Sequence, residues 1–233
     1  MLTYDNLIPT GIKELDEYLN GGFRSGCLCY IASSPGMGKT SLAVQLAVGA
    51  AKNGKNVLFF SLEESTEHVK ARIALQDGEN LPITVDDTSF VTVQYIKKRL
   101  EELGNIDMVI VDYFLLLYSE EKTVNRIKEI MSVFRNLKIM AKELKIPVIS
   151  ITPLFRDVSY TNRRPEWSDF RRFGTIDQDA DVLVFIHRER TEKENQYSEL
   201  KNETEIIIAK NRYGNIGTIN GIFNRKKLKF DFE

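Results

Sequence analysis

The chain has 233 residues, of which 42% are hydrophobic and 28% are charged, and its formal net charge is −1. This length fits one large domain or two small ones, and the composition is typical of globular proteins. The balanced charge excludes a globally basic nucleic-acid binder but leaves room for local basic surfaces. The chain starts without a basic segment followed by an apolar one, and its longest apolar run, residues 108–118, contains Asp112 and is too short for a membrane span. We therefore expect a cytoplasmic protein that does not associate with membranes.

A short helix is the first predicted element. Residues 1–9 show no periodicity and are expected to form an arm or linker, whereas residues 10–233 are expected to form one domain. Thr10 is a suitable cap for a helix whose apolar side chains recur at helical spacing and which ends at two glycines. These side chains are Ile12, Leu15 and Leu19, and the glycines are Gly21 and Gly22.

A core strand is predicted at residues 27–32, and it contains both cysteines of the chain, Cys27 and Cys29. Side chains two residues apart on a strand face the same way, so we expect both cysteines to pack in the core. Two cysteines provide neither a disulfide framework nor a set of metal ligands.

The strand leads into residues 31–41, Ile-Ala-Ser-Ser-Pro-Gly-Met-Gly-Lys-Thr-Ser, and an apolar helical pattern follows to about Asn53. A strand, a tight loop and a helix start together present backbone N–H groups and the positive end of a helix dipole, which suit a polyphosphate. Lys39 is expected to reach the outer phosphates, and Thr40 to offer its hydroxyl to Mg²⁺. The usual motif begins with Gly, where this chain has Ser33. The alternative is an ordinary turn, but Gly-Lys-Thr at the helix start favours nucleotide binding. The expected nucleotide-binding residues are Ser34, Pro35, Gly36, Met37, Gly38, Lys39, Thr40 and Ser41.

Strands and helices alternate along the rest of the chain. Further strands are predicted at residues 56–61, 84–88, 108–112, 147–152 and 181–186, and helices at 66–75, 93–103 and 127–144. The tail is predicted to form antiparallel strands at residues 205–209, 217–223 and 228–232. This alternation predicts an α/β domain with a mainly parallel, twisted sheet flanked by helices.

Acidic residues follow two of the predicted core strands. Asp112 ends an apolar strand, and parallel strands present their carboxyl ends to the ligand, so Asp112 is expected near Mg²⁺. Its alternative role is to cap a helix or loop. Glu63 and Glu64 follow another strand, where one of them is expected to activate the attacking water. Alternatively, both cap the next helix. Both interpretations hold if the two residues have different roles, with Glu63 as the base and Glu64 as the cap.

The ordered set of motifs resembles the C-terminal ATPase domain of the DnaB-type replicative DNA helicases. The stretches that carry the resemblance are Ser34-Pro-Gly-Met-Gly-Lys-Thr-Ser, Phe59-Phe-Ser-Leu-Glu63, Val109-Ile-Val-Asp112-Tyr113, Asn125-Arg126 with Glu129-Ile130, Arg164-Pro165 with Ser168-Asp169, Ile176-Asp-Gln-Asp-Ala-Asp181, and Ile206-Ile-Ile-Ala-Lys210-Asn-Arg212-Tyr-Gly214. They span nearly the whole chain in the order of the family. The resemblance implies a RecA-like P-loop NTPase core that binds ATP and Mg²⁺ and assembles as a ring, in this family a hexamer.

The resemblance also implies roles for individual residues. Glu63 corresponds to the catalytic glutamate of the family and acts on a triphosphate that Lys39 holds. A β-hairpin is implied to carry Lys210 and Arg212 into the ATP site of the neighbouring subunit. There the planar guanidinium would stabilise charge on the transferred phosphoryl group. Without the resemblance, both cations would be interpreted as solvated charge. The implied partners are further copies of the chain, single-stranded DNA, and primase or a helicase loader.

Three positions depart from the family pattern. Pro153 stands where helicases of this type usually carry the Gln that links the γ-phosphate to the DNA-binding loop, and proline has neither an N–H nor a polar side chain. Leu115 replaces another usual Gln, and Phe155 a usual Asn. We expect ATP binding to survive these changes, whereas coupling to strand movement is in doubt. The helical collar domain of the family has no counterpart in the sequence, which fits either a fragment or a stand-alone ATPase.

Two loops correspond to the DNA-binding loops of the family, namely residues 119–126 and 155–164. The residues expected to contact single-stranded DNA are Lys122, Arg126, Arg156, Arg163 and Arg164, with Phe155 and Tyr160 as stacking groups. The alternative is that these are ordinary surface loops, where Lys and Arg are common. Arg126 could instead pair with Glu129 along its own helix.

Three functional hypotheses follow. The first is an ATP-hydrolysing replicative helicase motor that translocates on single-stranded DNA as a ring. The second is a helicase-derived assembly or regulatory ATPase without unwinding activity, suggested by Pro153 and Leu115. The third is a RecA-like ATPase of the clock or recombinase type, suggested by the Thr10-Gly-Ile-Lys-Glu-Leu-Asp stretch and by Glu63-Glu64.

Overall fold

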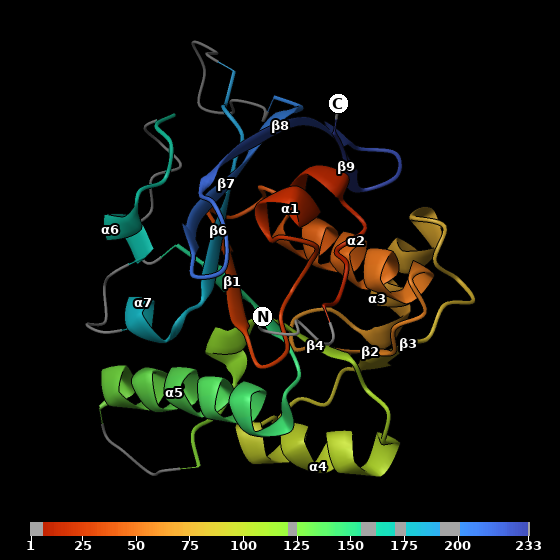
Figure 1. Ribbon diagram of the computed structural model, residues 1–233, viewed down its shortest axis with the longest axis vertical. Coiled ribbons are helices and arrows are strands. Elements are labelled where there is room, and N and C mark those ends of the chain that lie inside the picture. Colours follow the sequence, from red (N-terminus) through yellow and green to blue (C-terminus); the bar gives the residue numbers. More distant parts are fainter. Residues whose placement is uncertain (1–6, 121–124, 155–161, 171–175, 192–200, 233) are drawn as a thin grey trace, which may run out of the picture.

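The computed structural model describes residues 7–120, 125–154, 162–170, 176–191 and 201–232, with the backbone alone at 176 and 177. This part of the chain forms one nine-stranded sheet in the order β3-β2-β4-β5-β1-β6-β7-β8-β9 (Figure 1). The parallel strands are β1 (Leu28–Ser33), β2 (Val57–Ser61), β3 (Ile83–Asp86), β4 (Met108–Asp112), β5 (Val148–Pro153) and β6 (Val182–His187). The antiparallel strands are β7 (Glu203–Asn211), β8 (Gly217–Asn224) and β9 (Lys229–Phe232). The predicted α/β class, with antiparallel strands at its C-terminal end, is confirmed.

Helices cover both faces of the sheet. One face packs against α1 (Lys13–Tyr18), α2 (Lys39–Lys52) and α3 (Thr66–Leu75). The other face packs against α4 (Val93–Leu103), the short 3₁₀ helix η1 (Phe114–Leu116) and α5 (Arg126–Leu144). Figure 1 shows these two layers, and the short helices α6 (Trp167–Phe170) and α7 (Ile176–Asp179) to the left of the sheet in this view. No helix in the described ranges has both the length and the apolar character needed to cross a membrane.

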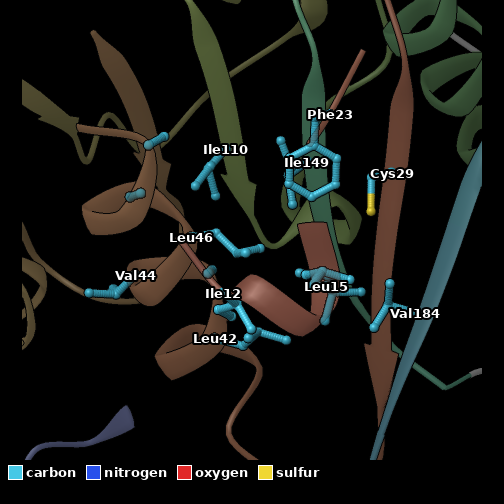
Figure 2. Packing of buried hydrophobic residues seen from close by; sticks show 14 of the residues in the cluster. Ile12, Leu15, Phe23, Cys29, Leu42, Val44, Leu46, Ile110, Ile149 and Val184 are labelled. Carbon is cyan, nitrogen blue, oxygen red and sulfur yellow. The ribbon is translucent and has the colours of Figure 1, made fainter. Parts of the chain in front are cut away.

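The central strands are buried along their whole length because helices cover both faces. Figure 2 shows one of the two resulting cores, in which side chains of α1 and α2 meet those of β1, β4 and β5. Cys27 and Cys29 both belong to this core as free thiols, as predicted from their spacing. Ile8, in the predicted arm, is also buried there and forms a β-bridge with Phe23.

Most predicted elements are present with ends shifted by a few residues, but two predicted caps are wrong. Ile12 occupies the N-cap position of α1, and the Thr10 hydroxyl accepts a hydrogen bond from the Ile12 backbone N–H at 3.1 Å. Thr10 therefore forms a turn before the helix. At α3, Ser65 is the cap, because its side chain accepts from the backbone N–H of His68 at 3.4 Å. The predicted cap, Glu64, is thereby free for another role.

A buried carboxylate ties three elements together at the edge of the sheet where β1 and β6 begin. Asp181 is almost fully buried and accepts a hydrogen bond from the Leu28 backbone N–H at 2.8 Å. It also accepts from the Lys138 ammonium of α5, which donates to the Gly26 carbonyl at 3.1 Å as well. Asp181 therefore links β1, β6 and α5.

We expect Asp181→Ala to lower the free energy of unfolding by about 3 kcal/mol, because the buried Leu28 N–H group loses its partner and the partly buried Lys138 ammonium loses its carboxylate, keeping the Gly26 carbonyl. Denaturant unfolding would measure this loss. Lys98→Ala is the matched control, because Lys98 and Glu102 form a surface pair 3.7 Å apart that contributes little to stability. Equal losses for the two variants would contradict this role of Asp181.

Candidate nucleotide-binding site

A cleft of about 410 Å³ opens at the carboxyl ends of the central parallel strands. The loop after β1 forms its floor, and the residues that follow β2 and β4 form one wall. Parallel strands end at the same edge of a sheet, so residues far apart in sequence meet here. The cleft residues expected from the sequence are Pro35, Gly36, Gly38, Lys39, Thr40, Ser41, Glu63 and Asp112. Ser34 and Met37 are buried and line a smaller cavity beside the loop instead.

The conformation of the loop depends on glycine at its end. Gly38 is the N-cap of α2 with a φ of 103°, in the left-handed region that disfavours L-residues. A Cβ at this position would also lie 2.8 Å from the Phe230 ring of β9. The loop therefore closes against the C-terminal strand only because residue 38 has no side chain.

Lys39 lies along the inside of the loop. Its Nζ donates to the backbone carbonyls of Ser33 and Ser34, both at 3.2 Å. Burial lowers the pKa of Lys39, and the nearby carboxylates of Asp112 and Glu63 oppose this shift. The Lys39 ammonium thus lies in the same cleft as Asp112 and Glu63, the two acids expected beside it.

Asp112 and Thr40, the two predicted metal ligands, meet in the cleft. Asp112 ends β4 with 4% of its surface exposed, and it lines the cleft together with Thr40. Burial raises the pKa of Asp112 to about 6, while Thr40 opposes the shift. A carboxylate beside a hydroxyl is a hard oxygen donor pair of the kind that Mg²⁺ prefers. In the described ranges no group of three or more His, Cys, Asp and Glu side chains could hold a metal, so further ligands would come from phosphate or water.

Glu63 and Glu64 differ in their surroundings. Glu63 lines the cleft and has neither a hydrogen bond nor an ion pair within the described part of the chain. Glu64 is held by Arg72 of α3, whose Nε and Nη2 donate to its two carboxylate oxygens at 2.8 and 2.7 Å. Glu63 is therefore the carboxylate available to a water molecule, and its role as the base stays a prediction, whereas Glu64 binds Arg72 and is not the cap of α3. Arg72, which also lines the cleft, has no recognisable signal in the sequence.

The predicted basic pair lies away from this cleft. Lys210 pairs with Leu183 at the start of β6, at the opposite edge of the sheet from the phosphate loop. Its Nζ lies 5.6 Å from the centroid of the Trp167 ring. Arg212 is half-exposed, donates to the Gln178 carbonyl and lies 3.4 Å from Asp181. Neither cation belongs to the cleft of its own chain.

The predicted DNA-binding cations that the structure describes all form local contacts. Arg126 pairs with Glu129 at 2.7 Å and donates to the Leu115 carbonyl at 2.8 Å. Arg163 donates to both oxygens of the fully buried Asp169, at 2.8 and 2.7 Å. The exposed Arg164 forms a similar fork with Glu205. Lys122, Arg156, Phe155 and Tyr160 lie outside the described residues.

The C-terminal strands complete the cleft, which the sequence did not predict. Phe223 of β8 and Leu228, next to β9, line its wall together with Tyr113 and Pro153. The side-chain amide of Gln45 on α2 holds β9 in place through two hydrogen bonds of 2.8 Å with the backbone of Phe230. The helix that begins at Lys39 thus also anchors the far wall of the cleft.

Comparison with known proteins decides the family. Residues 8–80 and 71–232 match the model of the DnaB-like helicase C terminal domain. The chain belongs to this family. The resemblance seen in its motifs is thereby confirmed, and the clock or recombinase type is set aside.

Individual relatives agree with this assignment. The chain is 33% identical to the replicative DNA helicase DnaB of Geobacillus stearothermophilus over 98% of its length, and 34% identical to a probable replicative DNA helicase of Trieres chinensis over 96%. It spans 60% and 56% of these two proteins. Among solved structures, a DnaB-like replicative helicase described with its primase interactions has a TM-score of 0.85 at 29% identity, over 96% of this chain and 61% of that one. A second solved structure, described as an ATPase domain, has a TM-score of 0.84 at 28% identity, over 97% and 91%. The RecA-like core implied by the motifs is thus the observed fold.

We expect Gly38→Ala to abolish tight nucleotide binding and to lower stability, because the new methyl group meets the Phe230 ring in a strained backbone conformation. Gly54→Ala is the matched control, since Gly54 has a φ of 75° but a Cβ added there would meet nothing within 4 Å. That variant should lose only about 1 kcal/mol of stability from the strain and retain binding. Binding of a fluorescent ADP analogue and thermal unfolding would separate the two effects.

Proposed function

We propose that this domain is the ATP-hydrolysing motor of a replicative DNA helicase that acts on single-stranded DNA as a ring. The observation that carries the proposal is the meeting of Lys39, Thr40, Asp112 and Glu63 in one cleft. These residues supply a phosphate-binding cation, two oxygen ligands and a carboxylate that can orient water, which are the parts that phosphoryl transfer needs. A function in DNA replication also supports a cytoplasmic location.

Mg²⁺ fits the donors present. Thr40 and Asp112 would hold it, and its charge would offset the negative charge of the phosphates. Lys39 would bind the outer phosphates from inside the loop, while backbone N–H groups at the start of α2 bind the remaining oxygens. Glu63 would orient a water molecule toward the terminal phosphate, because its carboxylate is not engaged by a described cation.

The separation of the basic pair from the cleft supports a ring. Lys210 and Arg212 lie at one edge of the sheet, and the phosphate loop lies at the other. A head-to-tail contact between copies, repeated around a closed ring, would bring Arg212 of one subunit to the ATP of its neighbour. We propose a hexamer, with hydrolysis dependent on assembly. Primase or a helicase loader is a further proposed partner, supported by the relative described with primase.

Single-stranded DNA is proposed to bind along the two predicted loops, residues 119–126 and 155–164. Of the described cations, Arg126 and Arg164 are the more exposed and could exchange their surface pairs for phosphate contacts. Arg163 is bound to a buried carboxylate, which favours a structural role. Binding through such cations would weaken steeply as the salt concentration rises.

A second function, that of an assembly or regulatory ATPase without unwinding, is favoured by Pro153. This residue lines the cleft and pairs in register with Ser33 of β1, and its side chain carries no hydrogen-bonding group for a phosphate. Hydrolysis could then proceed without moving DNA.

ATP turnover per subunit should rise with protein concentration and with added single-stranded DNA, because the site is completed between subunits. Lys39→Ala and Arg212→Ala should each be nearly inactive alone. Mixing the two should restore part of the activity, because some interfaces would combine an intact Lys39 with an intact Arg212. Steady-state ATPase assays would measure this. A fully active Arg212→Ala variant would contradict completion of the site in trans.

A forked duplex tests whether hydrolysis is coupled to unwinding. If the motor function is correct, strands should separate in the presence of ATP, and Lys39→Ala should separate none. Pro153→Gln is the informative variant, because it adds a side-chain amide at the cleft and should increase strand separation per ATP hydrolysed. Hydrolysis with no strand separation in either the unchanged chain or Pro153→Gln would favour the regulatory function.

A further inference from the structure

The turn that carries Arg212 is attached to the N-terminal helix. β7 ends at Asn211, and the turn that leads to β8 begins with Arg212. The Asn211 amide donates to the carbonyl of Tyr18, the last residue of α1, at 2.8 Å. A second amide, that of Asn20, donates in the opposite direction to the Tyr213 carbonyl at 2.6 Å. The residues on both sides of Arg212 are therefore bound to the end of α1.

Asn211 also determines the shape of the turn. Its side-chain oxygen accepts a hydrogen bond from the Tyr213 backbone N–H at 3.0 Å, and its amide donates to the Asn215 carbonyl at 3.1 Å. The turn lies so close to α1 that a Cβ at Gly214 would be 2.2 Å from the Tyr18 carbonyl oxygen. One side chain thus closes the turn and also fixes it to the helix.

The helix α1 is a fixed support for this turn. Leu15 of α1 and Leu19 after it are buried in the core, where Figure 2 shows Leu15. Just before α1, the chain packs directly on α2, because a Cβ added to Gly49 would lie 2.0 Å from the Thr10 carbonyl oxygen. Attachment to α1 therefore restrains the turn relative to the rest of the domain.

Lys210 and Asn211 have different surroundings, because neighbouring side chains on a strand point to opposite faces. Lys210 lies over the Trp167 ring, whereas Asn211 meets α1. Asn211 stands between the two cations proposed to act on a neighbouring subunit. Both its amide and its side-chain oxygen are bonded within its own chain. Its side chain thus holds this segment in place and is not directed to a nucleotide.

We propose that Asn211 is a positioning residue that holds the turn bearing Arg212 where the guanidinium can reach the ATP of the neighbouring subunit. Asn211 does not touch the reacting atoms, because it acts through Arg212. The inference rests on the proposed completion of the site between subunits. It predicts that loss of Asn211 impairs the site of the neighbouring subunit and leaves the cleft of its own chain intact.

Mixing experiments with the full chain test this prediction. Asn211→Ala should lower kcat by about 100-fold, the scale expected when a reacting group is misplaced by about 1 Å, with little change in KM or in binding of a fluorescent ADP analogue. Mixed with Lys39→Ala, it should regain activity, because its intact cleft then receives a well-placed Arg212. Mixed with Arg212→Ala, it should regain none, because neither chain offers a well-placed arginine.

Asn53→Ala is the matched control and should leave kcat unchanged. The Asn53 amide also donates to a backbone carbonyl at 2.8 Å, but to that of Gly49 at the end of α2. Asn20→Gly provides a second measurement should Asn211→Ala fold poorly. Asn20 is exposed and has a φ of 55°, which glycine adopts without strain, so this variant removes only the amide. It should lose less kcat than Asn211→Ala and show the same pattern on mixing.

Arg212→Ala separates this inference from the function on which it rests. If Arg212→Ala is inactive while Asn211→Ala is fully active, the proposed function stands and the role of Asn211 is overturned. Loss of nucleotide binding in Asn211→Ala, or no gain on mixing with Lys39→Ala, would also overturn it, because a purely structural defect damages the cleft of the same chain. If Arg212→Ala keeps full activity, completion of the site between subunits fails and the inference fails with it.

Discussion

Thr40 and the buried Asp112 meet in the cleft, and they join the two parts of the chain on which the cleft depends. Thr40 belongs to the first turn of α2, and Asp112 is the last residue of β4. Their meeting requires that the strands before them end at one edge, which a parallel sheet ensures. Removing a carboxylate from water is unfavourable unless something binds it. The Lys39 ammonium, which lines the same cleft, lowers the pKa of Asp112 against the effect of burial.

Different groups of residues lie at the two ends of the central strands. The carboxyl edge of the parallel strands holds the phosphate loop and the acids, and the opposite edge holds Asp181 with Arg212. Lys138 binds Asp181 from α5, so this second edge is rigid in its own right. A cation held on a rigid support far from its own cleft suits action on a neighbouring copy. The buried Asp181 thus links β1, β6 and α5 and also lies 3.4 Å from Arg212.

Much of this arrangement could be predicted from the sequence, for physical reasons. Apolar runs covered on both faces identify the central strands, and the order of strand, loop and helix places Lys39, Glu63 and Asp112 at one edge. Long-range contacts could not be predicted in the same way. Arg72 meets Glu64 across nearly the length of α3, and an arginine on a helix usually indicates only a solvated face. The closing of the cleft by Phe223 depends on a contact between Gln45 and Phe230 that local patterns do not encode.

Pro153 limits how a bound nucleotide can affect the rest of the domain. Its ring stands at the cleft without a donor, so no side chain at this position can follow the terminal phosphate. The backbone offers another route, because the Leu154 N–H donates to the Ser33 carbonyl at 3.1 Å. Ser33 in turn bonds to Lys39 through the same carbonyl. A shift of Lys39 on phosphate would therefore act on the segment after β5 through main-chain hydrogen bonds. This link needs no glutamine, so a main-chain connection between the phosphate loop and Leu154 is present despite Pro153.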